Sequence, residues 1–346
     1  MTLAAAIRTG DVTLLPSKRD EEWRWTDLRG LLRTLPGPSA AEADPIAPGP
    51  FGDLGEREIA VVNGRVLSGQ ASLTVAAGQR CTARLRFVAT CSECRHEASL
   101  AINVHAGGEL VLLESHEGLA HGYVAAATLD IRVEDGAGVE RIVLASDGDE
   151  AVNVACADVT LSPRARFAQT VLTDGAKRQR IETRIAHPGG AAETRLDGVY
   201  LIKGRRHGDL TTVVDHEGPG GSTAQLTKGV VQDQARAVFQ GRIIVAEGAD
   251  GTDARMGHHA LILSDRAEVD AKPELEIYAD DVSCAHGNTV GALDEDALFY
   301  ARQRGIPEQD ARAMLTAAFV GQVVDRIAHE GAREIARAWV AERLGV

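Results

Sequence analysis

The chain has 346 residues, of which 44% are hydrophobic and only 4% aromatic, so its core must consist mainly of Val, Leu, Ile and Ala. Its net charge of −13 argues against nucleic acid or an anionic membrane as the main partner. No apolar run reaches the roughly 18 residues that a transmembrane helix needs.

The N-terminal region, to about residue 35, is expected to be helical. The start, MTLAAAIRTGDV, is too short and too soon polar for a signal peptide. The segment EEWRWTDLRGLLRTL then spaces its apolar residues mostly at helical intervals, and we expect Trp23 and Trp25 to anchor it on a neighbouring element. The five cysteines of the chain form no regular framework, which indicates a reducing compartment and predicts a cytoplasmic protein.

A proline-rich stretch follows the N-terminal region. Residues 36–50, PGPSAAEADPIAPGP, hold five of the chain's eleven prolines. Because proline fixes φ and has no amide hydrogen to donate to a sheet, this stretch is expected to be an extended linker.

From about Ile59 to Ile277 the sequence is typical of β structure. Short runs such as GELVLLES, VERIVLAS and GRIIVAEG alternate with Gly, Asp and Asn, and none resembles a long amphipathic helix. Two architectures fit this pattern, a sandwich or pair of barrels and a parallel β-helix. Turn-like residues at Gly136, Pro163 and Gly189 recur at intervals of roughly 27 residues, close to the length of one β-helix coil, but this weak repeat does not decide between them.

Within this β region one motif has redox or metal-binding spacing. Cys91-Ser92-Glu93-Cys94 is a CxxC with His96 nearby, but no second CxxC follows, so a structural or incidental role is favoured over redox chemistry or metal binding. Cys81 and Cys156 have no recognisable spacing. Several histidines lie next to or two residues from a glycine and are expected at turns: His105, His116, His121, His207 and His216. On a strand, the adjacent pair His258-His259 would point to opposite faces, which makes it a poor chelator.

The most concentrated chemistry lies where the β region ends, in YADDVSCAHGNTVGALDEDALFY, from Tyr278 to Tyr300. On an extended strand, Cys284 and His286 would point to the same side. Thiol and imidazole are common donors for iron and zinc, but a closed site usually has four donors. We therefore expect either half of a metal or cluster site that another surface completes, or a small buried cysteine beside a hydrogen-bonded histidine.

From Asp294 the chain is predicted to be helical. Asp294 is a suitable N-cap, Gly305 a suitable stop, and Pro307 suits the first turn of the next helix. In that helix an apolar stripe is expected, made of Ala311, Met314, Leu315, Ala318, Phe319, Val323 and Ile327. The stripe either docks a partner or packs on the β region.

Several enzyme classes lack their motifs. No GxxxxGK[ST] loop is present, so we expect this chain to bind and hydrolyse no nucleotide, and no GxSxG elbow indicates an α/β-hydrolase. The pair Asp280-Asp281 would suit a β-helix enzyme that acts on polysaccharide, but the low aromatic content disfavours sugar binding.

The stretch from Lys272 to Phe319 resembles the C-terminal signature of the SufB/SufD family, the scaffold proteins of the Suf iron–sulfur cluster assembly system. Val213 to Ala254 is similar to the preceding coils of that family, and EEWRWTDL, Glu21 to Leu28, resembles the N-terminal motif of its SufD branch. The Cys-x-His of Cys284 and His286 also sits where the SufD branch has it.

The resemblance implies a mainly β fold, a right-handed parallel β-helix flanked by N- and C-terminal helical segments. It implies a non-enzymatic scaffold that pairs with a SufB paralogue and docks the ATPase SufC through about residues 294–327. His286 would then be a donor to iron or to a transient iron–sulfur cluster at the SufB interface, with Cys284 as a secondary donor. One departure is Gly221, because many relatives carry a cysteine at the matching position.

The chain is thus expected to divide into an N-terminal helical segment and linker (1–58), a β-helix core (59–290) and a C-terminal helical domain that docks SufC (291–346). In isolation a self-complementary C-terminal edge would allow a homodimer. Two alternatives from other classes stay open, a β-helix enzyme acting on polysaccharide and a β-solenoid interaction protein with no metal role.

Overall fold

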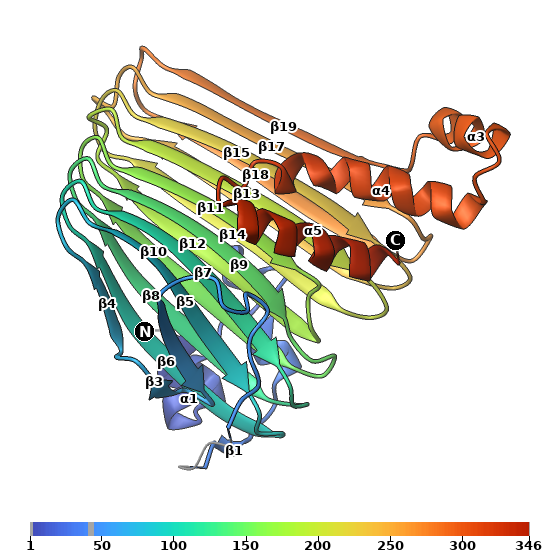
Figure 1. Ribbon diagram of the computed structural model, residues 1–346, viewed down its shortest axis with the longest axis horizontal. Helices are drawn as coiled ribbons and strands as arrows, with labels where there is room; N and C mark the ends of the chain where they lie inside the picture. The colour runs from blue at the N-terminus through green and yellow to red at the C-terminus, as the bar shows by residue number, and fades with distance from the viewer. Residues whose placement is uncertain (1–2, 41–44, 346) are drawn as a thin grey trace.

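The computed structural model describes residues 3–40 and 45–345, and it is a parallel β-solenoid with helices near both termini, as predicted (Figure 1). From β3 onward, successive strands alternate between two sheets. In the described residues sheet A has nine strands, β1 (Gly37–Pro38), β4 (Ser72–Val75), β6 (Cys94–Val104), β8 (Val124–Val133), β10 (Val152–Leu161), β12 (Arg178–His187), β14 (His207–His216), β16 (Arg236–Val245) and β18 (Glu268–Ile277).

The facing sheet, sheet B, has ten strands in the same described part of the chain. They are β2 (Arg57–Val62), β3 (Arg65–Ser68), β5 (Arg80–Ala89), β7 (Glu109–Gly118), β9 (Gly138–Ser146), β11 (Arg166–Thr173), β13 (Glu193–Ile202), β15 (Ser222–Val231), β17 (Asp253–Ile262) and β19 (Ser283–Gly291). Of the pairings among these nineteen strands, only that of β2 with β3 is antiparallel.

The register of sheet B explains the weak sequence repeat. Gly138 pairs with Arg166, Glu193 with Ser222, and Ser222 with Asp253, which are separations of 28, 29 and 31 residues. The predicted interval of roughly 27 residues is therefore close to one coil of the solenoid. Because side chains alternate across each strand, every second residue faces the space between the sheets, where aliphatic residues of both sheets form the main core.

The N-terminal region contains only short helices, whereas a helical segment to about residue 35 was predicted. They are α1 (Leu3–Thr9), the 3-10 turns η1 (Val12–Leu14) and η2 (Glu21–Trp23), and α2 (Leu28–Leu31). Contacts with sheet A replace a continuous helix, because Arg180 stacks at 4.3 Å on Trp23 and the Glu22 carboxylate bridges Arg184 and Arg242 at 2.9 Å each. Trp23 is therefore an anchor, as predicted.

The proline-rich stretch lies only partly within the described residues. Gly37–Pro38 forms β1, which pairs with β6, while residues 41–44 of the predicted linker lie outside the described part. A short strand contact thus interrupts the expected linker near its start.

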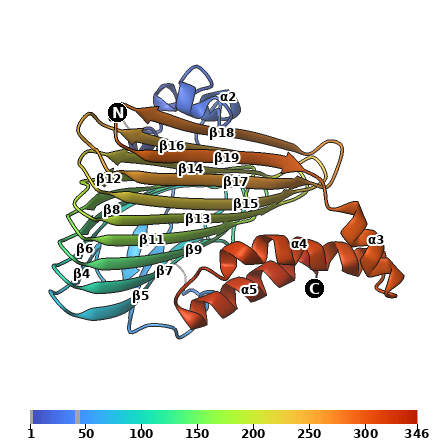
Figure 2. The same cartoon turned by 90° about the horizontal axis from the view of Figure 1, so that it is seen from above.

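Three helices end the chain, α3 (Glu295–Gln303), α4 (Glu308–Val324) and α5 (Glu330–Leu344). Asp294 caps α3 by accepting from the amides of Asp296 and Ala297, as predicted. Figure 2 shows α4 and α5 alongside sheet B, while α3 projects away from it. No helix in residues 3–40 or 45–345 is both long and apolar enough to cross a membrane.

The apolar stripe of α4 is only partly as predicted. Val323 and Ile327 are buried against sheet B, but Met314 is 53% exposed, and Thr316 and Val320 are buried instead. The α4 side chains that share a core cluster with sheet B come from the C-terminal half of the helix, from Phe319 to Val324, so burial follows the contacts and not the helical period alone.

Candidate functional site at the last turn of the solenoid

Cys284 and His286 lie on one face of β19, the last strand of sheet B. In the pairing with β17, Cys284 is opposite Ala254 and His286 is opposite Met256. Since Ala254 and Met256 belong to the core between the sheets, both donors face the inner side of the final turn. Cys284 is half-buried and packs against that core, while His286 is exposed.

The last turn leaves two strand edges open. β18 ends sheet A and β19 ends sheet B, and each has a single strand neighbour in the described part of the chain. Apolar side chains are exposed there, with Tyr278 64% and Val290 43% accessible. A long open edge with exposed apolar groups is typical of a surface that pairs with another chain.

The surroundings of Cys284 favour the protonated form of its thiol while no metal is bound. Burial raises the pKa of the Cys284 thiol, and the nearby Asp253 acts in the same direction, against a hydrogen bond from the Ala254 backbone. Within residues 3–40 and 45–345 no three or more His, Cys, Asp and Glu side chains gather to hold a metal ion. The site therefore offers two donors on this chain, short of a closed four-donor set.

Behind the donors a buried hydrogen-bond chain crosses four strands of sheet B. His258 lies 2.7 Å from the Asn288 Oδ1 through Nδ1 and 2.8 Å from the Tyr200 hydroxyl through Nε2. Because Oδ1 only accepts, His258 donates a hydrogen bond from Nδ1 and accepts one from the Tyr200 hydroxyl at Nε2. Asn288 follows His286 as the next residue on the inner face of β19, because side chains alternate along a strand. The hydrogen bonds from Tyr200 through His258 therefore hold β19 in place next to the donor.

Gly229 makes this chain possible. A Cβ on Gly229 would lie 1.8 Å from the ring of Tyr200, so the ring of Tyr200 crosses β15 only because that position has no side chain. The neighbouring His259 faces outward and bonds Thr289, so His258 and His259 point to opposite faces, as predicted. Sequence reasoning missed the partners of His258, because they come from strands that are 30 and 58 residues away.

The expectation that the glycine-flanked histidines lie at turns is wrong for three of them. His116, His207 and His216 are strand residues that are almost fully buried. Their rings fill polar positions of the interior, which a local Gly-His pattern cannot reveal.

Gly221 lies against one of these histidines. The rings of His187 and His216 stack with centroids 4.2 Å apart, and a Cβ on Gly221 would lie 2.4 Å from Cε1 of His187. A side chain at position 221 would therefore meet the imidazole rings of His187 and His216.

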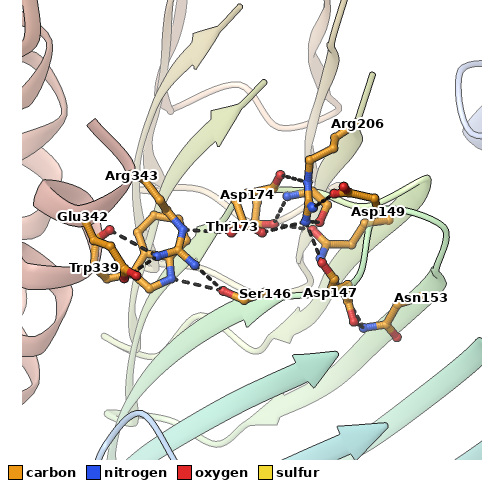
Figure 3. Close-up of polar contacts among 12 residues, drawn as sticks. Ser146, Asp147, Asp149, Asn153, Thr173, Asp174, Arg206, Trp339, Glu342 and Arg343 are labelled. Carbon is orange, nitrogen blue, oxygen red and sulfur yellow. Dashed lines mark hydrogen bonds and ion pairs between the residues drawn. The ribbon is translucent and has the colours of Figure 1, made fainter. Parts of the chain in front are cut away.

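The C-terminal helices are tied to the solenoid by buried ions. Arg326 on the segment after α4 bonds Asp197 of β13 at 2.9 Å, and burial raises the pKa of Asp197 to about 6 in spite of Arg326. Figure 3 shows the second tie, in which Asp174 accepts from Arg343 of α5 at 2.8 Å and from Arg206 at 3.0 Å. These ion pairs thus link the C-terminal helices to side chains on and next to the strands of sheet B.

The projecting end of the helical region has an apolar surface. Phe299 and Tyr300 on α3 and Met314 on α4 are exposed, and the Arg304 guanidinium lies over the Tyr300 ring at 4.8 Å. In the sequence, these exposed residues come directly before the part of α4 that packs on sheet B.

Comparison with known proteins gives the family. Residues 87–319 match the model of the SUF system FeS cluster assembly, SufBD core domain. The chain is 34% identical to the iron–sulfur cluster assembly protein SufD of Escherichia coli over 252 residues, which are 72% of this chain and 58% of that protein. It is 32% identical to a SufBD family protein of Synechocystis over 57% of this chain and 44% of the relative. It is 27% identical to a SufBD family protein of Mycobacterium tuberculosis over 97% of this chain and 91% of the relative.

The matched family domain covers β6 to β19 entirely and ends within α4, so it includes both donors and the open edges. On this match the chain belongs to the SufBD family of iron–sulfur cluster assembly proteins.

Proposed function

We propose that the chain is a SufD-like scaffold subunit that pairs with a SufB-type paralogue and docks the ATPase SufC, itself hydrolysing no nucleotide. A nascent iron–sulfur cluster, which is cargo for the scaffold, would form at the interface with SufB. The observation that carries the proposal is the placement of Cys284 and His286 on the inner face of β19, at an open end of the solenoid.

The donor chemistry supports a shared site. A neutral imidazole is a good donor to iron, and a thiolate binds iron and cluster sulfur sites well. This chain contributes two such donors where about four are needed, so the partner must supply the rest. Iron binding would also offset the raised pKa of Cys284, because coordination removes the thiol proton.

The open edges support the pairing surface. The ten-residue β18 and the nine-residue β19 present unpaired backbone groups beside exposed Tyr278 and Val290. A paralogue with the same final coil could continue both sheets. The same edge would let two copies of this chain pair in the absence of the paralogue.

The helical region supports the SufC surface. The exposed Phe299, Tyr300 and Met314 lie within the predicted docking segment 294–327. Phe299 and Tyr300 belong to α3, the helix that projects away from sheet B in Figure 2. The ion pairs Arg326–Asp197 and Arg343–Asp174 would transmit motion of a docked ATPase to the coils. Family membership favours this reading over a polysaccharide enzyme.

The test uses the reconstituted three-component complex with His286→Ala. We expect SufB and SufC to copurify unchanged, while the iron and sulfide bound per complex fall at least several-fold. His259→Ala is the matched control, because His259 is the outward-facing histidine of the neighbouring strand. Cluster yield is read from visible absorption and from iron and sulfide assays.

Two results would contradict the proposal. Full cluster yield with both Cys284→Ser and His286→Ala would leave a plain interaction protein as the better description. Failure of the unmodified chain to bind SufB and SufC under conditions that preserve such complexes would remove the scaffold role itself.

A further inference from the structure

A second group of cysteines lies at the other end of the solenoid, where a turn joins β5 to β6. This turn contains Cys91 and Cys94, and all five cysteines of the chain are free. Ser92 and Glu93 form the turn between them, and Glu93 adopts φ of 50° in the left-handed region. The turn therefore folds back sharply and brings its two ends together.

Neighbouring coils hold this turn in place. The side chain of the buried Asn63 accepts from the amides of Thr90 at 2.9 Å and Cys91 at 3.2 Å. On the other side, the Glu93 amide donates to the carbonyl of His121 at 3.0 Å. The spacing of the two cysteines is thus set by tertiary contacts and not by the turn alone.

The two thiols are adjacent and unequal. The Cys94 sulfur lies 3.1 Å from the Cys91 carbonyl oxygen, and Cys94 is only 4% exposed, while Cys91 is half-buried at the surface. Burial, together with the hydrogen bond and charge of the Cys91 thiol, raises the pKa of Cys94 to about 12. A more accessible thiol beside a buried, protonated one is the arrangement of an attacking and a resolving cysteine.

We propose that Cys91 and Cys94 form a reversible dithiol–disulfide pair, with Cys91 as the attacking thiol, Cys94 as the resolving thiol and hydrogen peroxide as the oxidant. The ends of a four-residue turn lie within about 7 Å of each other, and a disulfide spans Cα separations of about 4.4–6.8 Å. The bridge can therefore close with little movement of the strands.

The reaction balances with peroxide alone. The Cys91 thiolate attacks one peroxide oxygen, and the O–O bond breaks. Hydroxide departs as the leaving group, and Cys91 becomes a sulfenic acid. The Cys94 sulfur then attacks the Cys91 sulfur, the S–O bond breaks, and the Cys94 proton ends on water. Two thiols lose two electrons and peroxide becomes two water molecules, while a dithiol reductant reverses the step by thiol–disulfide exchange.

The structure favours this chemistry over a metal site. In the described ranges no third Cys, His, Asp or Glu joins the two thiols in a metal-binding group, and the His121 ring bonds the Ser92 hydroxyl at 3.1 Å. Two converging thiols are enough for a disulfide but not for a closed metal centre.

The test is peroxide treatment of the full chain, followed by alkylation under denaturing conditions and tryptic mass analysis. Cleavage after Arg86 and Arg95 releases one peptide, residues 87–95, that contains both cysteines and no other. We expect this peptide to lose two hydrogens and both alkylation sites, and dithiothreitol to restore them. Cys81, Cys156 and Cys284 are internal references and should remain mostly alkylated at the same peroxide dose.

Variants separate the two roles. In Cys94→Ser, dimedone should trap a sulfenic acid on Cys91, and in Cys91→Ser, Cys94 should stay alkylatable after denaturation. The proposal is overturned if the wild-type peptide keeps both alkylation sites, if Cys91 is overoxidised while Cys94 stays free, or if the reference cysteines oxidise equally fast. The turn lies at the opposite end of the solenoid from β19, so these experiments do not test the proposed cluster site. Either proposal can fail without the other.

Discussion

The edge strands at the two ends of the solenoid differ in length and in pairing. At the first coils, sheet A ends in β1 and β4, of two and four residues, and sheet B ends in the antiparallel hairpin of β2 and β3. At the last coil, β18 and β19 keep ten and nine residues and stay open. Short or turned-back edge strands prevent pairing with other chains, whereas long flat edges invite it.

The difference extends into the interior. Near the closed end, Glu114 and Arg141 form a bidentate ion pair at 2.8 Å, both fully buried, with Gln169 accepting a further hydrogen bond. Toward the open end, one polar chain is neutral and runs from the buried Tyr200 and His258 to Asn288 on β19. Buried charge also occurs at this level of the solenoid, in the ion pair of Arg180 with Asp209 at 3.1 Å. The hydrogen-bond chain from Tyr200 is thus the buried polar feature that reaches the last strand, β19, whereas the Glu114–Arg141 pair is enclosed within the earlier coils.

The largest expected effect is at the closed end, for Glu114→Ala. The change leaves Arg141 buried without its carboxylate, which should lower the free energy of unfolding by about 3–5 kcal/mol. Chemical denaturation monitored by circular dichroism measures it. Glu109→Ala is the control and should change stability by less than about 0.5 kcal/mol, because Glu109 lies on the same strand but is only partly buried and its ion pair with Arg166 is open to solvent. An equal loss in both variants would contradict the role assigned to burial.

A smaller effect is expected near the open end, for Gly229→Ala. The added methyl group would displace the Tyr200 ring and break its bond to His258, which should cost about 1–3 kcal/mol. Gly287→Ala on β19 is the matched control, since a Cβ there meets nothing within 4 Å. If the hydrogen-bond chain also positions β19, Gly229→Ala should lower the cluster yield of the complex while Gly287→Ala leaves it unchanged.

The smallest effect for a single group is in the pH dependence of stability. Burial, aided by His187, lowers the pKa of His216 to about 3, below its ordinary value of 6.5. Between these two values the unfolded chain binds the proton and the folded chain does not, so stability falls as pH drops below 6.5. His216 contributes a slope of about 1.4 kcal/mol per pH unit at most.

His207 and His96 add in the same direction, since burial lowers their pKa values to about 3 and about 4. Urea titrations at pH 7 and pH 5 measure the slope, and His216→Gln should flatten it by about one proton. A slope that is identical in the variant would show that His216 is protonated in the folded chain.

Local patterns predicted the elements whose signals are local. The strand texture predicted the β region, the cap at Asp294 predicted the start of α3, and the spacing of Cys284 and His286 predicted that they share a face. The predictions that failed concern neighbours along the solenoid axis. The N-terminal helix was replaced by contacts of Trp23 and Glu22 with sheet A, and buried histidines were mistaken for turn residues.

The sequence by itself determined the β region, the helical C-terminal region and the pair of donors on one strand, because alternation and capping act over a few residues. The residue pattern left the stacking of the strands open, and only the family resemblance pointed to a parallel β-helix. Only the tertiary structure decided that this strand is the open edge, that Gly229 admits Tyr200 to His258, and that Asn63 sets the turn of Cys91 and Cys94. Those contacts join residues 27 or more positions apart, and stacking of coils brings them together with no trace in the local pattern.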